Sequence, residues 1–268
     1  MNRINESEKG DNYNTHQNRN LLSSFSFNTD DINKDNIKII GHRGNQGIAV
    51  ENSYNAILDC SNNDNIDGTE FDIRPTKDDK IIIMHNENVN GTTNSKGRIQ
   101  DLTLEELKQL HFTTQTVDQF LQKLFNIFNK DQYFYHQYCN LGKQSSKIAL
   151  FDEVMKNYSL NKHMLIELKG KIAEYSNSKQ RYFEDNIVDI LKKYDYQNRD
   201  LALEGYNYDA LFRIKEKLPD LKIIALINKN GNLKPLNMDF DGVSLEYNLL
   251  NESVVEKVMK NNMVLYSW

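Results

Sequence analysis

The chain has 268 residues, of which 38% are hydrophobic and 26% charged, and its formal net charge is −5. The acidic balance excludes the basic surface typical of nucleic-acid-binding proteins, and no apolar run reaches the roughly 18 residues of a membrane span. The polar N-terminus lacks the apolar core of a signal peptide. Two distant cysteines, Cys60 and Cys139, fit neither a disulfide scaffold nor a zinc motif. We therefore expect a protein of a reducing, cytoplasmic compartment without a nucleic-acid partner.

Residues 1–36 and 37–268 differ in pattern. The first segment is polar, rich in Asn and aperiodic, which predicts a disordered tail. In the second, short apolar strands alternate with amphipathic helices, which predicts a parallel sheet in an α/β domain. Strands are expected at IKII, GTEFDI, MLIELK, LALEGY, LKIIALI, GVSLEY and MVLYSW. Seven such units favour a TIM (β/α) barrel over an open sheet.

Helices are expected between these strands, at 51–63, 103–111, 149–159, 181–194, 207–218 and 250–261. The first of them begins with Asn52 as its predicted N-cap. The second has the spacing of a capping box, with Glu106 three residues after Thr103.

One pair of apolar segments breaks the alternation. EFDIRP and KIIIMHN are separated only by TKDD, whereas a parallel crossover needs a dozen or more residues. The two segments must therefore form a hairpin, which returns His85 toward the end of EFD. This predicts an insertion at about 74–110, and a second insertion at 113–147 contains the aromatic tract YFYHQY.

Carboxylates lie within two of the predicted strands. Glu70 and Asp72 are two residues apart and share a strand face, and Glu167 and Lys169 repeat this spacing. Because the carboxyl ends of barrel strands lie at one face, the three carboxylates are expected to converge there. Three carboxylates, with no Cys or His residues at a metal-binding spacing, suit one Mg²⁺ or Ca²⁺ ion held by oxygen atoms. The alternatives are a solvated strand end for the first pair and a buried ion pair for the second.

Two histidines and an arginine are predicted at the same face. His42 and Arg43 end the first strand, and the hairpin brings back His85. Each histidine alone is more often structural, but two histidines beside carboxylates and an arginine predict shared acid–base work. The guanidinium fork of Arg43 suits phosphate oxygens. Together these residues indicate phosphodiester cleavage.

Several motifs resemble the glycerophosphodiester phosphodiesterases over residues 38–268. They are GHRG, ENS, EFDIRPTKDDKIIIMHN, GTTNSKGRIQDLTLEEL, IELK and VLYSW. The resemblance implies a TIM barrel with a small insertion after the second strand. It also implies an acid–base pair, His42 and His85, one divalent cation on Glu70, Asp72 and Glu167, and substrate binding by Arg43, Glu51 and Lys169.

The reaction implied by this resemblance is hydrolysis of a small-molecule glycerophosphodiester to sn-glycerol 3-phosphate and an alcohol. Two alternatives stay open: a phospholipase of C or D type, whose aromatic tract touches a membrane, and an inactive relic with a binding role. The sequence departs from the family at Val50, where Pro is usual, and at Asn86, where Asp is usual.

The family pattern continues beyond Trp268 with a further strand and helix. The expectation is therefore a barrel truncated before its last strand and helix. Its first and seventh strands would be open edges, and the chain would be marginally stable.

Overall fold

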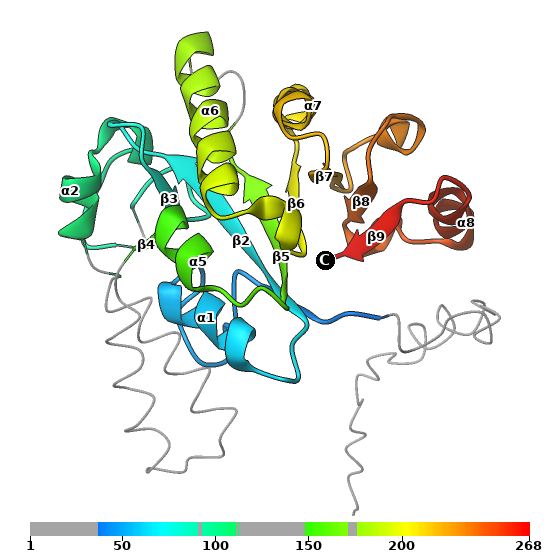
Figure 1. The fold of residues 1–268 in the computed structure, drawn as a ribbon, viewed down its shortest axis with the longest axis horizontal. Helices are drawn as coiled ribbons and strands as arrows, with labels where there is room; N and C mark the ends of the chain where they lie inside the picture. Colours follow the sequence, from blue (N-terminus) through cyan, green and yellow to red (C-terminus); the bar gives the residue numbers. More distant parts are fainter. Residues whose placement is uncertain (1–36, 91–92, 111, 113–147, 171–175) are drawn as a thin grey trace, which may run out of the picture. The chain divides into compact units, whose positions relative to one another are not determined.

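Seven parallel strands follow one another through one sheet in a computed structural model of the chain (Figure 1). The structure describes residues 37–90, 93–110, 112, 148–170 and 176–268, so the predictions for the tail and the aromatic tract lie outside it. The strands are β1 (Ile40–His42), β2 (Gly68–Pro75), β5 (His163–Leu168), β6 (Leu201–Gly205), β7 (Lys222–Ile227), β8 (Gly242–Leu245) and β9 (Val264–Ser267). A strand is present for each of the seven predictions, in an α/β fold of the barrel type, but β1 begins only at the last residue of the predicted IKII segment.

Helices follow the strands and cover one face of the sheet (Figure 1). They are α1 (Tyr54–Asn62), α5 (Phe151–Asn157), α6 (Asn177–Lys193), α7 (Tyr208–Lys217) and α8 (Glu252–Lys260). The short helix α2 (Leu104–Lys108) lies in the insertion, and its Leu107 belongs to a separate buried cluster with Ile82 and Met84. Short 3-10 turns are η3 (Ile99–Asp101), η5 (Tyr196–Asn198), η6 (Lys234–Asn237) and η7 (Tyr247–Leu249). Among the described residues, no helix is long and apolar enough to cross a membrane.

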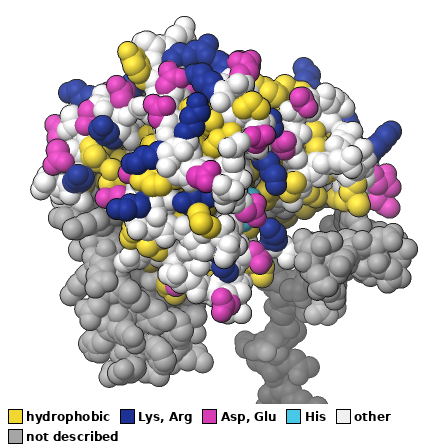
Figure 2. All heavy atoms as spheres, viewed as in Figure 1, with side chains coloured by type: hydrophobic (Ala, Val, Ile, Leu, Met, Phe, Trp, Pro, Cys, Tyr) yellow, Lys and Arg dark blue, Asp and Glu magenta, His cyan; other side chains and the backbone are white. Residues whose placement is uncertain are grey.

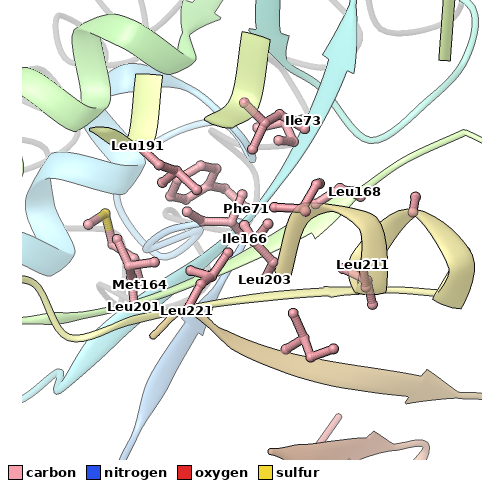
Figure 3. Close-up of a cluster of buried hydrophobic side chains, with 14 of the residues drawn as sticks. Phe71, Ile73, Met164, Ile166, Leu168, Leu191, Leu201, Leu203, Leu211 and Leu221 are labelled. Carbon is pink, nitrogen blue, oxygen red and sulfur yellow. The ribbon is translucent and has the colours of Figure 1, made fainter. Parts of the chain in front are cut away.

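The core lies between the sheet and these helices. Phe71, Ile166 and Leu203, from three neighbouring strands, are fully buried and gather with Leu191 of α6 (Figure 3). Burying a side chain of this size contributes roughly 1.5–3 kcal/mol. Since successive residues of a strand point to opposite faces, the residues between them point away from the helices, into the interior of the curved sheet.

The predicted hairpin is confirmed. The strand β3 (Ile81–Ile83) is antiparallel to β2, with Ile73 opposite Ile83, and the amide of Met84 donates to the carbonyl of Asp72 at 2.9 Å. A further strand, β4 (Ala149–Leu150), pairs with β3 and was not predicted. It takes the first two residues of the segment 149–159, so the helix there starts later than predicted.

The caps of two helices test the sequence predictions directly. The predicted N-cap Asn52 of α1 is wrong by one residue, because the Ser53 hydroxyl accepts from the amide of Ala56. The side-chain amide of Asn52 instead donates to the carboxylate of Asp72 in the sheet interior. The capping box of α2 is confirmed: Thr103 Oγ1 accepts from the Glu106 amide at 3.3 Å, and Glu106 Oε2 accepts from the Thr103 amide at 2.7 Å.

The series of parallel strands ends at β1 and β9, while β3 and β4 branch from β2, and no pairing joins β1 to β9 in the described part of the chain. A side chain from β9 nevertheless crosses the interior, because Tyr266 Oη lies 3.1 Å from His163 Nε2 at the start of β5. On the face seen in Figure 2, acidic and basic side chains are interspersed. That face has no continuous basic surface, as the acidic composition predicts.

Candidate active site

Four carboxylates lie in the sheet interior, near the carboxyl ends of the strands. Glu70 and Asp72 are on β2, Glu167 is on β5 and Glu204 is on β6. Asp72 is the register partner of Glu167, which is in turn the partner of Glu204. All four side chains are buried, so a solvated strand end, the alternative for Glu70 and Asp72, does not apply. The parallel register therefore places acidic groups from three neighbouring strands together.

Three of these groups form a tight cluster that suits a cation. One carboxylate oxygen from each of Glu70, Glu167 and Glu204 lies within 4.8 Å of the others. Burial, reinforced by the neighbouring carboxylates, raises the pKa of Glu70 well above its usual range and that of Glu204 to about 8. Burial likewise raises the pKa of Glu167 to about 7. A bound cation would relieve this repulsion.

Orphaned oxygen atoms support the same interpretation. Glu70 Oε1 and Glu204 Oε2 are buried and, among the described residues, have no hydrogen-bond partner. Burying an unpaired polar atom is unfavourable. Carboxylate oxygens are the preferred ligands of Mg²⁺ and Ca²⁺, so the residues present fit a hard divalent cation.

Asp72 is held differently from the three glutamates. Lys169 Nζ lies 3.0 Å from Asp72 Oδ1 and 2.7 Å from Glu167 Oε1. Asn52 Nδ2 donates to Asp72 Oδ2 at 2.7 Å. Burial alone would raise the pKa of Asp72, but Lys169 and the Asn52 hydrogen bond lower it. The ion pair considered for Glu167 and Lys169 is therefore present, and it extends to Asp72.

The GHRG turn directs Arg43 into the site. Arg43 and Gly44 have left-handed φ angles of 58° and 81°, and a Cβ atom on Gly44 would lie 2.6 Å from the Ala56 carbonyl carbon. The turn thus needs glycine at that position. The Arg43 amide donates to Glu70 Oε2 at 2.9 Å, and Arg43 Nη1 donates to Glu51 Oε1 at 3.0 Å.

The two predicted catalytic histidines lie beside these charges. His42 Nε2 is 3.8 Å from Glu70 Oε2, and His85 Nδ1 is 3.1 Å from Asn86 Oδ1. Burial, followed by the positive charge of Arg43, lowers the pKa of His42. Burial and the positive charge of Lys169 lower the pKa of His85. Both shifts favour the neutral imidazole, which is the form that can accept a proton.

The structure thus brings together all eight residues proposed from the sequence. It also adds three residues that were not assigned to the site from the sequence: Asn52, Arg74 and Glu204. Glu204 carried a usable signal, since LALEGY places a lone carboxylate in an apolar strand, as LIELKG does for Glu167. Arg74 lies two residues after Asp72 on the same strand, so it shares a strand face with Glu70 and Asp72. Its hydrogen-bond partner is a backbone carbonyl, which no sequence pattern identifies.

The chain is similar to several known phosphodiesterases. The glycerophosphodiester phosphodiesterase of Caldanaerobacter subterraneus subsp. tengcongensis is 27% identical over 239 residues, which cover 86% of this chain and 84% of that protein. A phosphodiesterase of Oleispira antarctica, solved in complex with the product sn-glycerol-3-phosphate, has a TM-score of 0.68 at 19% identity and covers 87% and 84% of the two chains.

A third relative is the glycerophosphodiester phosphodiesterase of Thermotoga maritima, whose structure has a TM-score of 0.59 at 21% identity and covers 87% of this chain and 85% of that one. The family model described as the glycerophosphoryl diester phosphodiesterase family matches residues 42–268. The chain belongs to this family of phosphoric diester hydrolases.

Proposed function

We propose that the chain hydrolyses glycerophosphodiesters to sn-glycerol 3-phosphate and an alcohol by two-histidine acid–base catalysis. One observation carries the proposal: an exposed histidine, His42, and a partly buried one, His85, both with a lowered pKa, lie beside Arg43 and a buried carboxylate cluster. A neutral imidazole can accept a proton and an imidazolium can donate one, and the cationic side chain of Arg43 suits a phosphodiester. The Oleispira antarctica relative, whose fold is similar, was solved with sn-glycerol-3-phosphate.

Substrate binding is assigned to Arg43, Lys169 and Glu51. The guanidinium and ammonium groups offer donors and positive charge to the phosphate oxygens. Arg43 Nε is buried without a hydrogen-bond partner in the described part of the chain, which leaves a donor for a ligand. Glu51 holds Arg43 Nη1 at 3.0 Å and so fixes the direction of the guanidinium.

One divalent cation, Mg²⁺ or Ca²⁺, is assigned to Glu70, Asp72 and Glu167. The shared burial of these carboxylates and the orphaned Glu70 oxygen support the assignment. When bound, such a cation stabilises negative charge that develops on the phosphoryl oxygens.

Proton transfer is divided between the histidines. One imidazole removes the proton of the attacking hydroxyl group as its oxygen bonds to phosphorus. The other starts as the protonated imidazolium and donates that proton to the alkoxide as the bond to phosphorus breaks, so one proton is taken up and one is given. We assign the role of the acid to His85, which follows the β2–β3 hairpin, and the role of the base to His42.

A free thiol supports a reducing, cytoplasmic setting for this enzyme. Cys60 is buried in α1 and is not in a disulfide. Burial raises the pKa of its thiol to about 11, so the reactive thiolate is scarce at pH 7.

Turnover of two substrates by the purified chain tests the proposal. A glycerophosphodiester and an intact phospholipid are each incubated with Mg²⁺ or Ca²⁺, and released sn-glycerol 3-phosphate, phosphoalcohol and free head group are measured. We expect sn-glycerol 3-phosphate from the glycerophosphodiester only, and none with His42→Ala. Turnover of phospholipid alone would indicate the phospholipase alternative, and no turnover of either would indicate the binding role.

A further inference from the structure

We propose that Glu204 is a fourth carboxylate ligand of the divalent cation, and that it makes the site prefer Ca²⁺ to Mg²⁺. The inference rests on the cation site of the proposed function and adds a residue from β6 to it. The set assigned above, Glu70, Asp72 and Glu167, comes from β2 and β5. Glu204 therefore extends the site to a third strand.

The sheet register places Glu204 where a ligand is needed. It is the direct partner of Glu167, and parallel register partners point to the same face. One of its oxygens lies within 4.8 Å of an oxygen of both Glu70 and Glu167. Asp72 is not a member of this closest cluster, and its two oxygens contact Lys169 and Asn52. The closest group of carboxylate oxygens thus includes Glu204.

The partners of Glu204 leave one of its oxygens available. The side chain is 3% exposed, and Ser244 of β8 donates a hydrogen bond to its carboxylate. Oε2 has no hydrogen-bond partner among the described residues, although it is buried. A serine that fixes one oxygen while the other is unpaired is the arrangement expected of an oriented ligand.

The number of carboxylates argues for the larger ion. Glu204 joins Glu70 and Glu167 in one cluster, and Asp72, the register partner of Glu167, adds a fourth neighbouring carboxylate, so four carboxylates come from three adjacent strands. Ca²⁺ accepts six to eight oxygen ligands with flexible geometry, whereas Mg²⁺ needs a strict octahedron and usually binds one or two carboxylates and several waters. A cluster rich in carboxylates and fixed by strands therefore suits Ca²⁺ better.

The alternative is that Glu204 is a protonated, purely structural side chain. Glutamine has nearly the same shape as a protonated glutamate, so Glu204→Gln separates the two roles. A structural carboxylic acid would be replaced with little effect on cation binding. If Glu204 is instead a ligand, the substitution removes a carboxylate from the cation, and cation binding weakens.

Calorimetric titration of Ca²⁺ and of Mg²⁺ into the full chain without substrate provides the test. Glu204→Gln should raise the Kd for Ca²⁺ at least about tenfold and the Kd for Mg²⁺ by less than about threefold. Glu256→Gln, which removes the same charge from the exposed surface of α8, should bind both ions like the wild type. Glu204→Asp retains a shortened carboxylate and should bind Ca²⁺ with intermediate affinity.

A Ca²⁺ affinity of Glu204→Gln within twofold of the wild type would overturn the assignment of Glu204 as a ligand. Equal losses for both ions would overturn the Ca²⁺ preference. If Glu204→Gln fails to fold, Glu204→Asp carries the test, and wild-type affinity in that variant would overturn the assignment. Wild-type chain that binds neither ion yet hydrolyses the diester would instead contradict the cation site of the proposed function.

Discussion

The guanidinium group of Arg74 donates hydrogen bonds from Nε and Nη2 to the backbone carbonyl of His85, at 3.0 and 2.7 Å. Arg74 is buried near the end of β2, and His85 follows β3, so the contact joins the two arms of the hairpin. A buried guanidinium with two bonds to one carbonyl fixes the backbone rather than the imidazole. Arg74 is therefore a positioning residue for His85.

Replacing Arg74 should lower the turnover number more than the substrate affinity. In Arg74→Ala the backbone at His85 loses both bonds, and a shift of about 1 Å can cost up to a hundredfold in rate. We expect kcat to fall by roughly ten- to a hundredfold while KM changes by less than about threefold. Arg74→Lys, which restores one donor, should recover part of the loss.

Steady-state kinetics and thermal melting, measured on the same preparations, separate positioning from global destabilisation. Arg181→Ala removes an exposed arginine of α6 and should leave kcat unchanged. An unchanged kcat in Arg74→Ala would show that the hairpin holds His85 without this contact.

Asn52 combines a strained backbone with two contacts to Asp72. Its φ angle is 57°, its Nδ2 donates to Asp72 Oδ2, and its Oδ1 accepts from the Asp72 amide. Asn52→Gly and Asn52→Ala both lose the amide, but only glycine adopts this φ without steric cost. The free energy of unfolding of Asn52→Ala should therefore be lower than that of Asn52→Gly by about 1 kcal/mol.

Denaturant unfolding and kcat/KM are the measurements for this pair. Both variants should lose activity by a similar factor, because the Asp72 contact is absent in each. An alanine variant as stable as the glycine variant would mean that the turn relaxes from its left-handed conformation.

The roles of the two histidines predict different responses to the leaving group. An acid that protonates the leaving alkoxide matters less when the leaving group is already acidic, such as nitrophenolate. A nitrophenyl diester should therefore partly rescue His85→Ala but not His42→Ala. The ratio of kcat/KM for the nitrophenyl and natural diesters measures this rescue. Equal ratios in the two variants would contradict the division of labour.

Asp200 contacts the start of β5, and this contact makes the free energy of unfolding depend on pH. Its Oδ1 lies 3.0 Å from His163 Nδ1, and its Oδ2 lies 3.1 Å from Lys38 Nζ. The His163 hydrogen bond, with Lys38, lowers the pKa of Asp200 in the folded state. A carboxylate of lowered pKa contributes stability above its unfolded pKa of about 3.9, and that contribution is lost as the pH falls toward the folded value.

Asp200→Asn should therefore unfold more easily than the wild type at pH 7, by about 1 kcal/mol. The difference should persist down to about pH 5 and shrink at lower pH. Urea unfolding across this pH range measures it, with the exposed Asp64→Asn as a control that should differ from the wild type by less than about 0.5 kcal/mol. A difference that does not vary with pH would mean that packing, not charge, accounts for the loss.

Local sequence patterns were enough to predict the strands, the hairpin and the placement of His85. The hairpin follows from chain length alone, since TKDD is too short for a crossover. The facing carboxylates follow from strand periodicity. Each of these features depends on residues that are close together in the chain, so it can be predicted from the sequence alone.

Features that depend on distant partners were not predictable in the same way. Asn and Ser are equally good N-caps, so propensity does not choose between Asn52 and Ser53. The side chain of Asn52 is hydrogen-bonded to Asp72, twenty residues away, and Ser53 caps α1. β4 is two residues long and exists only by pairing with β3. Glu204 joins the carboxylate cluster through the register of β5 and β6, which no local pattern specifies.

Cation dependence of hydrolysis tests the central claim most directly. The release of sn-glycerol 3-phosphate from a glycerophosphodiester is measured after chelation and again after Mg²⁺ or Ca²⁺ is restored. We predict that chelation abolishes turnover, that the cation restores it, and that Glu167→Ala greatly raises the cation concentration needed. Full turnover in chelator, with Glu70→Ala as active as the wild type, would contradict the account.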